Sequence, residues 1–390
     1  MAANVTRVRE PSRRDRKPEG SSSRFTRVLK RLEIERFRGV RDLVLDDLAP
    51  VTILTGRNGS GKTTVLEAAF LLCGLSNATL VFSLAAFRGV PAIAGADTAF
   101  RVLLPDLLEG GTASIAGATD VHAGNGRLAL EIAGITAPMR AGPSTEPGAQ
   151  LVGLEFRARS RSGERKGSVR WEPAPIGPGA PVLELGPMRF EGVPGIRTEI
   201  PDNPDRLSAR YVRPQPHASM LELHSLLTSL LQRRAMGNVL DLVRLIAPDV
   251  NELHPLLELG QPVIYIDTGA ERLFPAQILG GGFINLLQLT TFMCEEASQL
   301  LLIDELEDGL HYSVLPALAE AVISFAKERS KQFLIATHSR DVVRAFGEAA
   351  RETPEMVTFC KIYKQGGVTK AARFSVDDWQ NLDEIGGEIR

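Results

Sequence analysis

The 390-residue sequence contains only three cysteines, far apart and odd in number. Cys73, Cys294 and Cys360 show no zinc-ligand spacing and no disulfide framework, which fits a reducing compartment. Each lies in apolar sequence, so we expect buried structural thiols. No apolar run reaches the roughly 18 residues that a membrane-spanning helix needs, and no apolar signal core opens the sequence. We therefore expect a cytoplasmic protein that has no membrane partner.

Net charge is also small, at −2, but it is unevenly distributed. Residues 1–31 hold ten Lys and Arg and three Asp and Glu, so the rest of the chain is acidic. Residues 1–27 are predicted to form a disordered basic tail, because Ser, Arg and Pro cannot build a core. Such a tail is either solvated or touches nucleic acid. Hydrophobic residues make up 44% of the chain, enough for a sizeable core in one large domain or two smaller ones.

One stretch carries the phosphate-binding pattern of Gly, four residues, then Gly-Lys-Ser/Thr. The matching run is Gly56, Arg57, Asn58, Gly59, Ser60, Gly61, Lys62, Thr63 and Thr64. A strand-like run at 51–55 precedes it and a helix-like run at 65–72 follows, which is the context that the pattern requires. Backbone N–H groups and the helix N-terminus would surround phosphate oxygens. Lys62 is expected to reach the β- and γ-phosphates, and Thr63 to bind Mg²⁺.

Two later strands end in polar residues. The buried run at 300–303 ends in Asp304 and Glu305, and the run at 331–336 leads into Thr337, His338 and Ser339. On one parallel sheet these ends converge with the phosphate loop at the same edge. Asp304 would then bind Mg²⁺, and Glu305 would orient or deprotonate the attacking water. His338 is predicted to hydrogen-bond the γ-phosphate.

The chain is predicted to be α/β: a P-loop NTPase whose mixed sheet is flanked by helices and carries a β-rich insertion. Its ATPase domain is expected in two parts, residues 28–76 and residues 219–390, the latter opening with a helical segment. Residues 77–218, with short alternating runs and many turns, form the insertion between them. Strands near 32–35, 43–45 and 51–55 would begin the sheet. An Arg-rich hairpin tip is expected at 159–167, either solvated or on a phosphate backbone.

Spacing separates this chain from other phosphate-loop proteins. About 240 residues lie between Lys62 and Asp304, and the Asn-Lys-x-Asp motif of Ras-like GTPases is absent. The glycines at 280–282 open a helix and would make a second anion-binding nest. The order of phosphate loop, long insertion, Gly-rich nest, Asp-Glu and His resembles ABC-type ATPases of the SMC-like and OLD-like groups. The run at 304–315, with 336–339, is similar to AAA-family ATPases of bacterial phage-defence systems, including the PARIS ATPase subunit.

This resemblance implies ATP as the nucleotide and implies roles for further residues. Gly280, Gly281 and Gly282 occupy the signature position, which completes the nucleotide site of a second subunit. The resemblance thus implies a homodimer or higher homo-oligomer that closes around ATP. Arg38 stands where related proteins place an arginine near the nucleotide. A partner effector, a nuclease encoded nearby, is also implied, because only about 50 residues follow His338, too few for a nuclease domain in this chain.

The sequence departs from the family pattern at three places. Leu279-Gly280-Gly281-Gly282-Phe283 stands where Leu-Ser-Gly-Gly-Gln is usual, and no glutamine precedes Gln150 to sense Mg²⁺ soon after the phosphate loop. His311 stands where the family usually has an aspartate, after the Asp-Glu segment, that links the two nucleotide sites. Three hypotheses follow: an ATPase that controls an effector in antiviral defence, a DNA-binding SMC-like or repair ATPase, and a nucleotide-dependent scaffold with little turnover.

Overall fold

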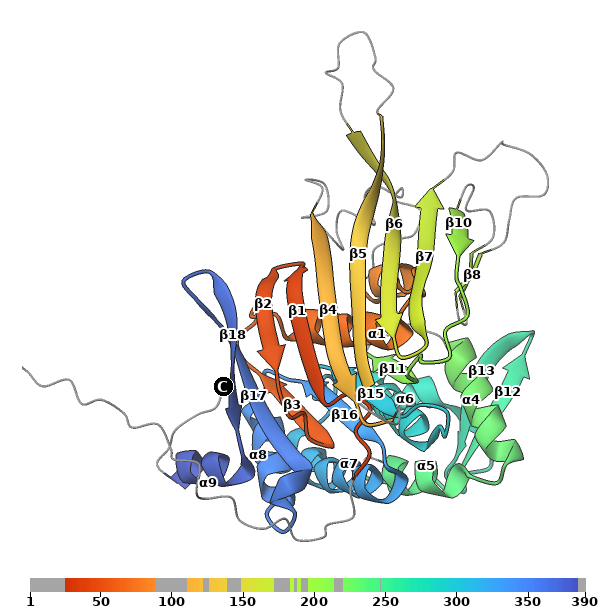
Figure 1. Cartoon of the computed structure of the whole chain (residues 1–390). Coiled ribbons are helices and arrows are strands. Elements are labelled where there is room, and N and C mark those ends of the chain that lie inside the picture. The colour runs from red at the N-terminus through yellow and green to blue at the C-terminus, as the bar shows by residue number, and fades with distance from the viewer. Residues whose placement is uncertain are drawn as a thin grey trace, which may run out of the picture.

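The computed structural model describes most of the chain in segments. The described residues are 25–88, 111–121, 126–138, 149–171, 183–185, 188–190, 196–213, 220–245 and 247–384. Two large sheets, one mostly parallel and one antiparallel, lie on either side of one helix, and further helices cover the outer face of the mostly parallel sheet (Figure 1). The predicted disordered tail falls, up to residue 24, outside the described residues.

The central sheet is mostly parallel and contains the strand that precedes the phosphate loop. Its order is β11-β15-β16-β3-β17-β18, and only β18 runs antiparallel to its neighbour. The strands are β3 (Val51–Thr55), β11 (Ala209–Val212), β15 (Leu300–Asp304), β16 (Gln332–Ala336), β17 (Val357–Gln365) and β18 (Val368–Phe374). Every residue of β3, β15 and β16 is buried, as expected for parallel strands covered on both faces. The ends of these three strands therefore meet at one edge, as the sequence predicted.

Helix α1 (Lys62–Gly74) lies between the two large sheets. It is buried nearly all round, so it has no polar stripe, as expected for a helix in the interior. Leu300 and Leu302 of β15 join the core around α1, whereas Leu301 and Ile303 face the opposite core. That opposite core is formed with α6 (Gly281–Cys294), α7 (Leu315–Arg329) and α8 (Arg340–Ala349). Side chains of both cores thus fix the position of the strand that ends in Asp304.

The second large sheet is antiparallel and has the order β10-β7-β6-β5-β4-β1-β2. Its strands are β1 (Arg31–Phe37), β2 (Val40–Leu45), β4 (Thr112–Thr119), β5 (Gly126–Pro138), β6 (Ala149–Ser160), β7 (Gly163–Trp171) and β10 (Ile196–Glu199). The expectation that the runs near 32–35 and 43–45 share a sheet with 51–55 is wrong. Strands β1 and β2 instead begin the sheet that the β-rich segment continues, and their apolar faces cover α1.

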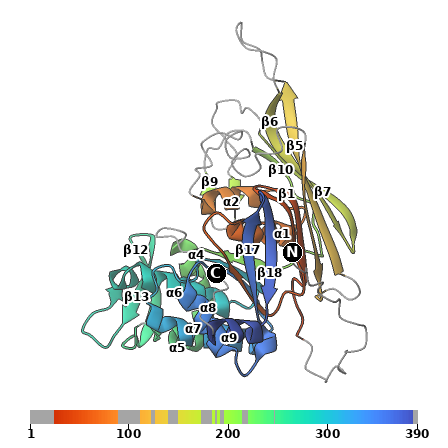
Figure 2. The same cartoon turned by 90° about the vertical axis from the view of Figure 1, so that its left-hand side faces the viewer.

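A smaller unit lies at the far end of the molecule from the antiparallel sheet (Figure 2). It contains α4 (Met220–Gln232), α5 (Met236–Val243) and a three-stranded sheet of β12 (Glu252–Glu258), β13 (Gln261–Asp267) and β14 (Phe274–Pro275). A third apolar core joins these elements to α6. The unit therefore supports the glycine nest, which lies at the start of α6.

Short elements complete the described chain. They are α2 (Leu80–Phe87), β8 (Leu183–Leu185), β9 (Met188–Phe190), the single-turn helices η3 (Ala276–Leu279), η4 (Tyr312–Val314) and η5 (Pro354–Met356), and α9 (Val376–Glu384). Of the three thiols, Cys73 and Cys360 are buried as expected, while Cys294 is half-buried. No helix in the described part of the chain is long and apolar enough to cross a membrane.

Candidate nucleotide-binding site

The phosphate loop joins β3 to α1 and depends on its glycines. Gly56, Gly59 and Gly61 all have positive φ, which glycine adopts without strain. A Cβ on Gly56 would lie 2.1 Å from the carbonyl oxygen of Ile362 on β17, so the loop also lies close against the neighbouring strand. The backbone conformation that points the loop N–H groups inward therefore requires glycine at these three positions.

Lys62 is the first residue of α1, and its amine points back into the loop. Its Nζ donates hydrogen bonds to the carbonyls of Gly56 at 2.7 Å and Arg57 at 3.2 Å. Burial lowers the pKa of Lys62, and the carboxylates of Asp304 and Glu305 partly offset this effect. A buried cation held only by carbonyls is ready to exchange them for anionic phosphate oxygens.

Asp304 and Thr63 meet although 241 residues separate them. The Thr63 hydroxyl donates to Asp304 Oδ1 at 3.3 Å, while the Tyr211 hydroxyl donates to Oδ2 at 3.3 Å. Burial raises the pKa of Asp304, and the hydrogen bond from Thr63 opposes that shift. Thr63 and Asp304 are the two side chains that would hold Mg²⁺.

Sequence reasoning missed Tyr211. It lies on β11, beside Asp304 on β15, and stacks on Phe87 with ring centroids 5.0 Å apart. Phe70 packs edge-on against the same ring. Burial, with Asp304 nearby, raises the pKa of Tyr211 well above its usual range, so the phenol keeps its proton and remains a donor. The only available signal was an aromatic residue in a short apolar run before the helical segment.

Glu305 follows the strand with an unusual backbone. Its φ is +56°, in the left-handed region that side chains rarely adopt, and its carboxylate is exposed. Its N–H donates to the Ala336 carbonyl at 2.9 Å, which anchors the turn to the end of β16. The strained turn directs the side chain into solvent at the sheet edge, where a water could be activated.

Glu307 was also missed, and it organises the segment that contains His338. Its Oε1 accepts hydrogen bonds from the Thr337 hydroxyl at 2.8 Å and from the N–H groups of His338 and Ser339, both at 3.1 Å. The Nδ1 of His338 lies 3.2 Å from the same oxygen. One carboxylate oxygen thus joins the loop after β15 to the loop after β16.

Arg38 lies near a second buried carboxylate. It forms an ion pair with Glu67 of α1, and Arg88 after α2 forms another at 2.7 Å. The side chain of Glu67 is 2% exposed, so the burial cost of its charge is offset by two guanidinium groups. This network ties the β1–β2 turn and the end of α2 to the helix that carries Lys62.

The glycine nest lies at the start of α6, where Gly280 and Gly281 are exposed and Gly282 is partly buried. Among the described residues, no hydrogen bond or ion pair joins the glycine nest to the phosphate loop of the same chain. It packs instead on the turn after Glu307: a Cβ on Gly282 would lie 1.9 Å from the Gly309 carbonyl oxygen. The Asn285 amide donates to the Asp308 carbonyl at 3.1 Å.

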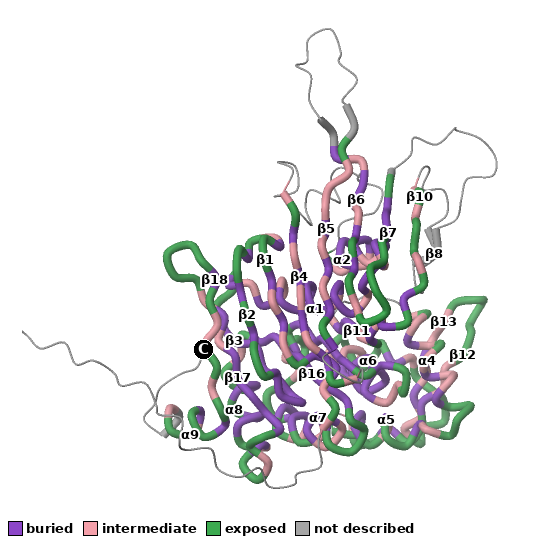
Figure 3. Tube along the Cα trace, viewed as in Figure 1, coloured by how far each residue is buried: buried purple, intermediate pink, exposed green. Residues whose placement is uncertain are grey.

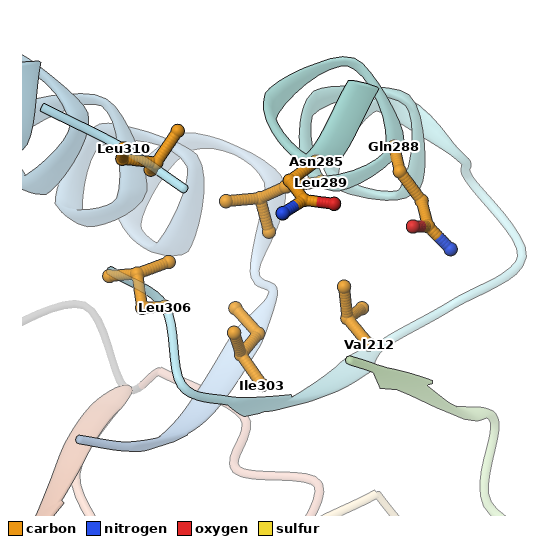
Figure 4. A pocket seen from close by; sticks show the side chains of 7 residues that line it. All are labelled: Val212, Asn285, Gln288, Leu289, Ile303, Leu306 and Leu310. Carbon is orange, nitrogen blue, oxygen red and sulfur yellow. The ribbon is translucent and has the colours of Figure 1, made fainter. Parts of the chain in front are cut away.

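A small pocket lies between α6 and the ends of β11 and β15 (Figure 4). Its walls are Val212, Asn285, Gln288, Leu289, Ile303, Leu306 and Leu310. The cavity is about 20 Å³, which is room for a water molecule and far too little for a nucleotide. The phosphate edge of the sheet, rather than this pocket, is the candidate binding site.

Comparison with known proteins places these residues in two matched regions. Residues 187–344 match the family described as "AAA domain, putative AbiEii toxin, Type IV TA system", and residues 31–79 match a second family described as "AAA domain". The two matched regions together contain every candidate site residue, from Arg38 to His338.

Individual proteins are similar to this chain over different lengths. The DNA replication and repair protein RecF of Acinetobacter baylyi is 52% identical over 42 residues, which is 11% of this chain and 12% of RecF. The Smc head domain from Pyrococcus furiosus, solved with the C-terminal domain of ScpA, is 14% identical over 92% of this chain and 99% of that one, with a TM-score of 0.49. The SMC head domain from Thermotoga maritima is 16% identical over 89% and 99%, with a TM-score of 0.42.

The observed order of strand, phosphate loop and helix, together with the AAA matches, confirms the predicted fold class. The fold is α/β, that of a P-loop NTPase, with a mixed sheet flanked by helices. Within the described ranges no group of three His, Cys, Asp or Glu side chains could hold a metal ion alone. Mg²⁺ at Thr63 and Asp304 would therefore take its remaining ligands from phosphates and water, as it commonly does.

Proposed function

We propose that this chain binds and hydrolyses ATP, closes around it as a homodimer, and controls a partner effector in antiviral defence. The observation that supports nucleotide binding is the contact between Thr63, just after the phosphate loop's lysine, and Asp304 at the end of β15. Residues 241 positions apart in sequence meet with the donor set that a Mg²⁺–triphosphate requires.

The chemistry follows from where each side chain lies. Lys62 exchanges two carbonyl partners for phosphate oxygens, and the loop N–H groups hold the remainder of the charge. Bound Mg²⁺ would neutralise charge on the phosphates. Glu305, exposed at the sheet edge, orients or deprotonates the attacking water. Glu307 holds the His338 segment where its ring can donate to the terminal phosphate.

Dimerisation is supported by the exposure of the glycine nest. Gly280 and Gly281 have no atom within 4 Å of an added Cβ, so nothing in the described chain covers that side. The N-terminus of a helix attracts anions through its backbone N–H groups. In the described chain, the start of α6 makes no hydrogen bond or ion pair with the phosphate loop of the same subunit. Ile278, two residues before Gly280, and Tyr312, three residues after the Gly309 on which Gly282 packs, are exposed by 67% and 66%, which suits burial against a second copy.

A role in defence is supported by the matched family, whose description names a toxin of a type IV toxin–antitoxin system. We propose that the effector is a separate protein, a nuclease, and that it is encoded nearby. Sequencing the neighbouring reading frames tests this directly: a nuclease gene alongside supports it, and housekeeping neighbours alone would count against it.

Phosphate release tests the enzyme assignment. Wild type should release phosphate from ATP with Mg²⁺, Lys62→Ala should lose ATP binding, and Glu305→Gln should keep binding but lose turnover. If Glu305→Gln turns over ATP like the wild type, Glu305 is not the base. If wild type binds ATP tightly with no release, the chain is a nucleotide-dependent scaffold.

A DNA-binding repair ATPase is the second candidate, supported by the short RecF match. The exposed arginines of β6 are paired: Arg157 with Glu155 at 2.7 Å, and Arg159 with Glu164 at 3.0 Å. Deleting residues 1–27 should then abolish salt-dependent DNA binding if this candidate is correct. Absence of DNA affinity in the presence of ATP would exclude it.

A further inference from the structure

Strand β11 is followed by an arginine at the edge of the sheet that carries the phosphate loop. The last residue of β11, Val212, pairs with Ile303 of the parallel neighbour β15. The next residues along the two strands, Arg213 and Asp304, therefore come level with each other at the sheet edge. Strands β3, β15 and β16 are buried along their whole lengths (Figure 3). A cation at the end of a strand in such a sheet is unusual unless it has a partner or a ligand.

Arg213 lies on the face of the sheet that is covered by α1. Along β11, Tyr211 packs in the core around α1, while Val212 faces the opposite core. Because side chains alternate along a strand, Arg213 returns to the α1 face. Its Nη1 donates a hydrogen bond to the carbonyl of Phe87, whose ring stacks on Tyr211, and this bond agrees with the alternation. The helix that begins with Lys62 therefore lies on the same side of the sheet as Arg213.

The guanidinium of Arg213 is also close enough to Asp304 to act on its charge. Burial raises the pKa of both Asp304 and Tyr211, and the guanidinium opposes the shift in each of them. Asp304 accepts the hydrogen bond from Thr63, and these two side chains would hold Mg²⁺. Arg213 is thus a cation beside a carboxylate of the nucleotide site, and because it is only half-buried, a ligand can reach it.

The fold satisfies this guanidinium only in part. Among the described residues, the structure gives it one hydrogen bond, to the Phe87 carbonyl, and no ion pair with a carboxylate. A guanidinium has several further N–H donors. A half-buried cation loses part of its hydration, and a carbonyl compensates for that loss less well than an anion does. Lys62 is in the same condition, because it too is held by backbone carbonyls.

We propose that Arg213 binds the terminal phosphate of ATP. In the sheet order, β15 lies between β11 and the strand that leads into the phosphate loop, so Arg213 and Lys62 would approach the phosphates from opposite sides of Asp304. Arginine suits this task because its planar fork matches phosphate oxygens and its charge is permanent. Charge on the transferred phosphoryl group is what the transition state needs to have stabilised. This inference rests on the proposed function, because it adds a residue to the same nucleotide site.

Nucleotide binding separates this role from a structural one. A side chain on the terminal phosphate distinguishes the non-hydrolysable ATP analogue AMP-PNP from ADP, which lacks that phosphate. In titration calorimetry with Mg²⁺, Arg213→Gln should bind AMP-PNP at least about tenfold more weakly than the wild type and should bind ADP within about twofold of it. Equal weakening for the two nucleotides, or no weakening for either, would overturn the proposal.

The choice of variants keeps folding out of the result. Arg213→Gln retains an N–H donor for the Phe87 carbonyl, so its melting temperature should stay near that of the wild type. Arg213→Lys keeps the charge without the fork and should bind AMP-PNP with an affinity between those of Arg213→Gln and the wild type. If Arg213→Gln does not fold, Arg213→Lys alone should still weaken AMP-PNP and spare ADP. An Arg213→Lys variant that binds AMP-PNP more weakly than Arg213→Gln would contradict a contact made through charge.

Arg244→Gln is the matched control. Arg244 also donates to backbone carbonyls, those of Val250 at 2.8 Å and Asn251 at 3.0 Å, but it belongs to the unit of α4 and α5 and is outside the nucleotide site. Both nucleotides should bind this variant like the wild type. If Arg244→Gln discriminated against AMP-PNP as strongly as Arg213→Gln does, the effect would not come from a phosphate contact.

The wild-type measurements keep this inference apart from the proposed function. A wild type that binds neither nucleotide would refute nucleotide binding itself, and the role of Arg213 with it. A wild type that binds both, with Arg213→Gln unchanged, would refute the role of Arg213 alone. If the wild type releases phosphate from ATP, kcat should fall by about 10- to 100-fold in Arg213→Gln, and an unchanged kcat would count against a contact with the transferred group.

Discussion

Replacing Glu307 should separate the His338 segment from the rest of the site. In Glu307→Ala, the Thr337 hydroxyl and the N–H groups of His338 and Ser339 lose one shared acceptor. At roughly 1 kcal/mol for each donor, the loss is about 3 kcal/mol. Glu307 Oε2 is buried with no partner among the described atoms, so removing it returns about 1 kcal/mol. The expected net destabilisation is about 2 kcal/mol.

The effect on activity should exceed the effect on stability. A segment that is free to shift by about 1 Å no longer presents His338 to the terminal phosphate, and such misplacement costs about 100-fold in rate. We expect kcat to fall by about 10- to 100-fold in Glu307→Ala with little change in KM. Glu307→Gln keeps an acceptor oxygen but loses its charge, so its loss should be several-fold smaller.

The matched control is Glu348→Ala on α8, the helix that follows the same segment. Glu348 accepts from Arg344 at 2.9 Å on an exposed helix surface, a pair worth about 0.3–0.5 kcal/mol. Urea unfolding and steady-state phosphate release measure both variants. Wild-type kcat in Glu307→Ala, or an equal loss in Glu348→Ala, would refute the positioning role.

Three further outcomes are expected. Tyr211→Phe should raise the Mg²⁺ concentration needed for half-maximal turnover, because Asp304 loses a hydrogen bond from a buried donor; an unchanged Mg²⁺ dependence, measured by titration, would contradict this. Asp304→Asn should raise the melting temperature of the nucleotide-free protein near pH 7 while abolishing turnover. The pKa of Asp304 is raised in the folded protein, so its contribution to folding stability is complete below the ordinary pKa near 4 and is lost as pH rises through the folded-state pKa. The rise in melting temperature of the Asn variant should therefore shrink in acid. Melting curves from pH 4 to 8 would show this. Gly282→Ala should be strongly destabilised by the clash with the Gly309 carbonyl, whereas the neighbouring Gly281→Ala, with open space around it, should unfold like the wild type in urea.

The motifs could be predicted from sequence because their physical requirements are local. Glycines with positive φ, a following helix and an apolar strand ending in carboxylates each appear as a short pattern, so the sequence alone indicates Lys62, Thr63 and Asp304. The parallel order of the strands brings them together as expected.

Residues that act through long-range contacts could not be predicted. Tyr211 has no motif of its own, and its role exists only because β11 pairs beside β15. Glu307 reads in sequence as one more carboxylate in an acidic turn, and only the structure shows which oxygen its neighbours share. The prediction that β1 and β2 share a sheet with β3 was wrong for the same reason. The alternation of apolar and polar residues along a strand indicates which face is apolar, but not which sheet the strand joins.

The most direct test of the central claim is to mix two inactive variants. Lys62→Ala has an intact nest without a working phosphate loop, and Gly281→Trp has an intact loop with a blocked nest, at a position where the fold leaves space. If each ATP lies between one subunit's loop and the other's nest, the mixture should regain part of the phosphate release that neither variant shows alone. A mixture as inactive as its components, or a Gly281→Trp variant that is fully active by itself, would contradict the shared site.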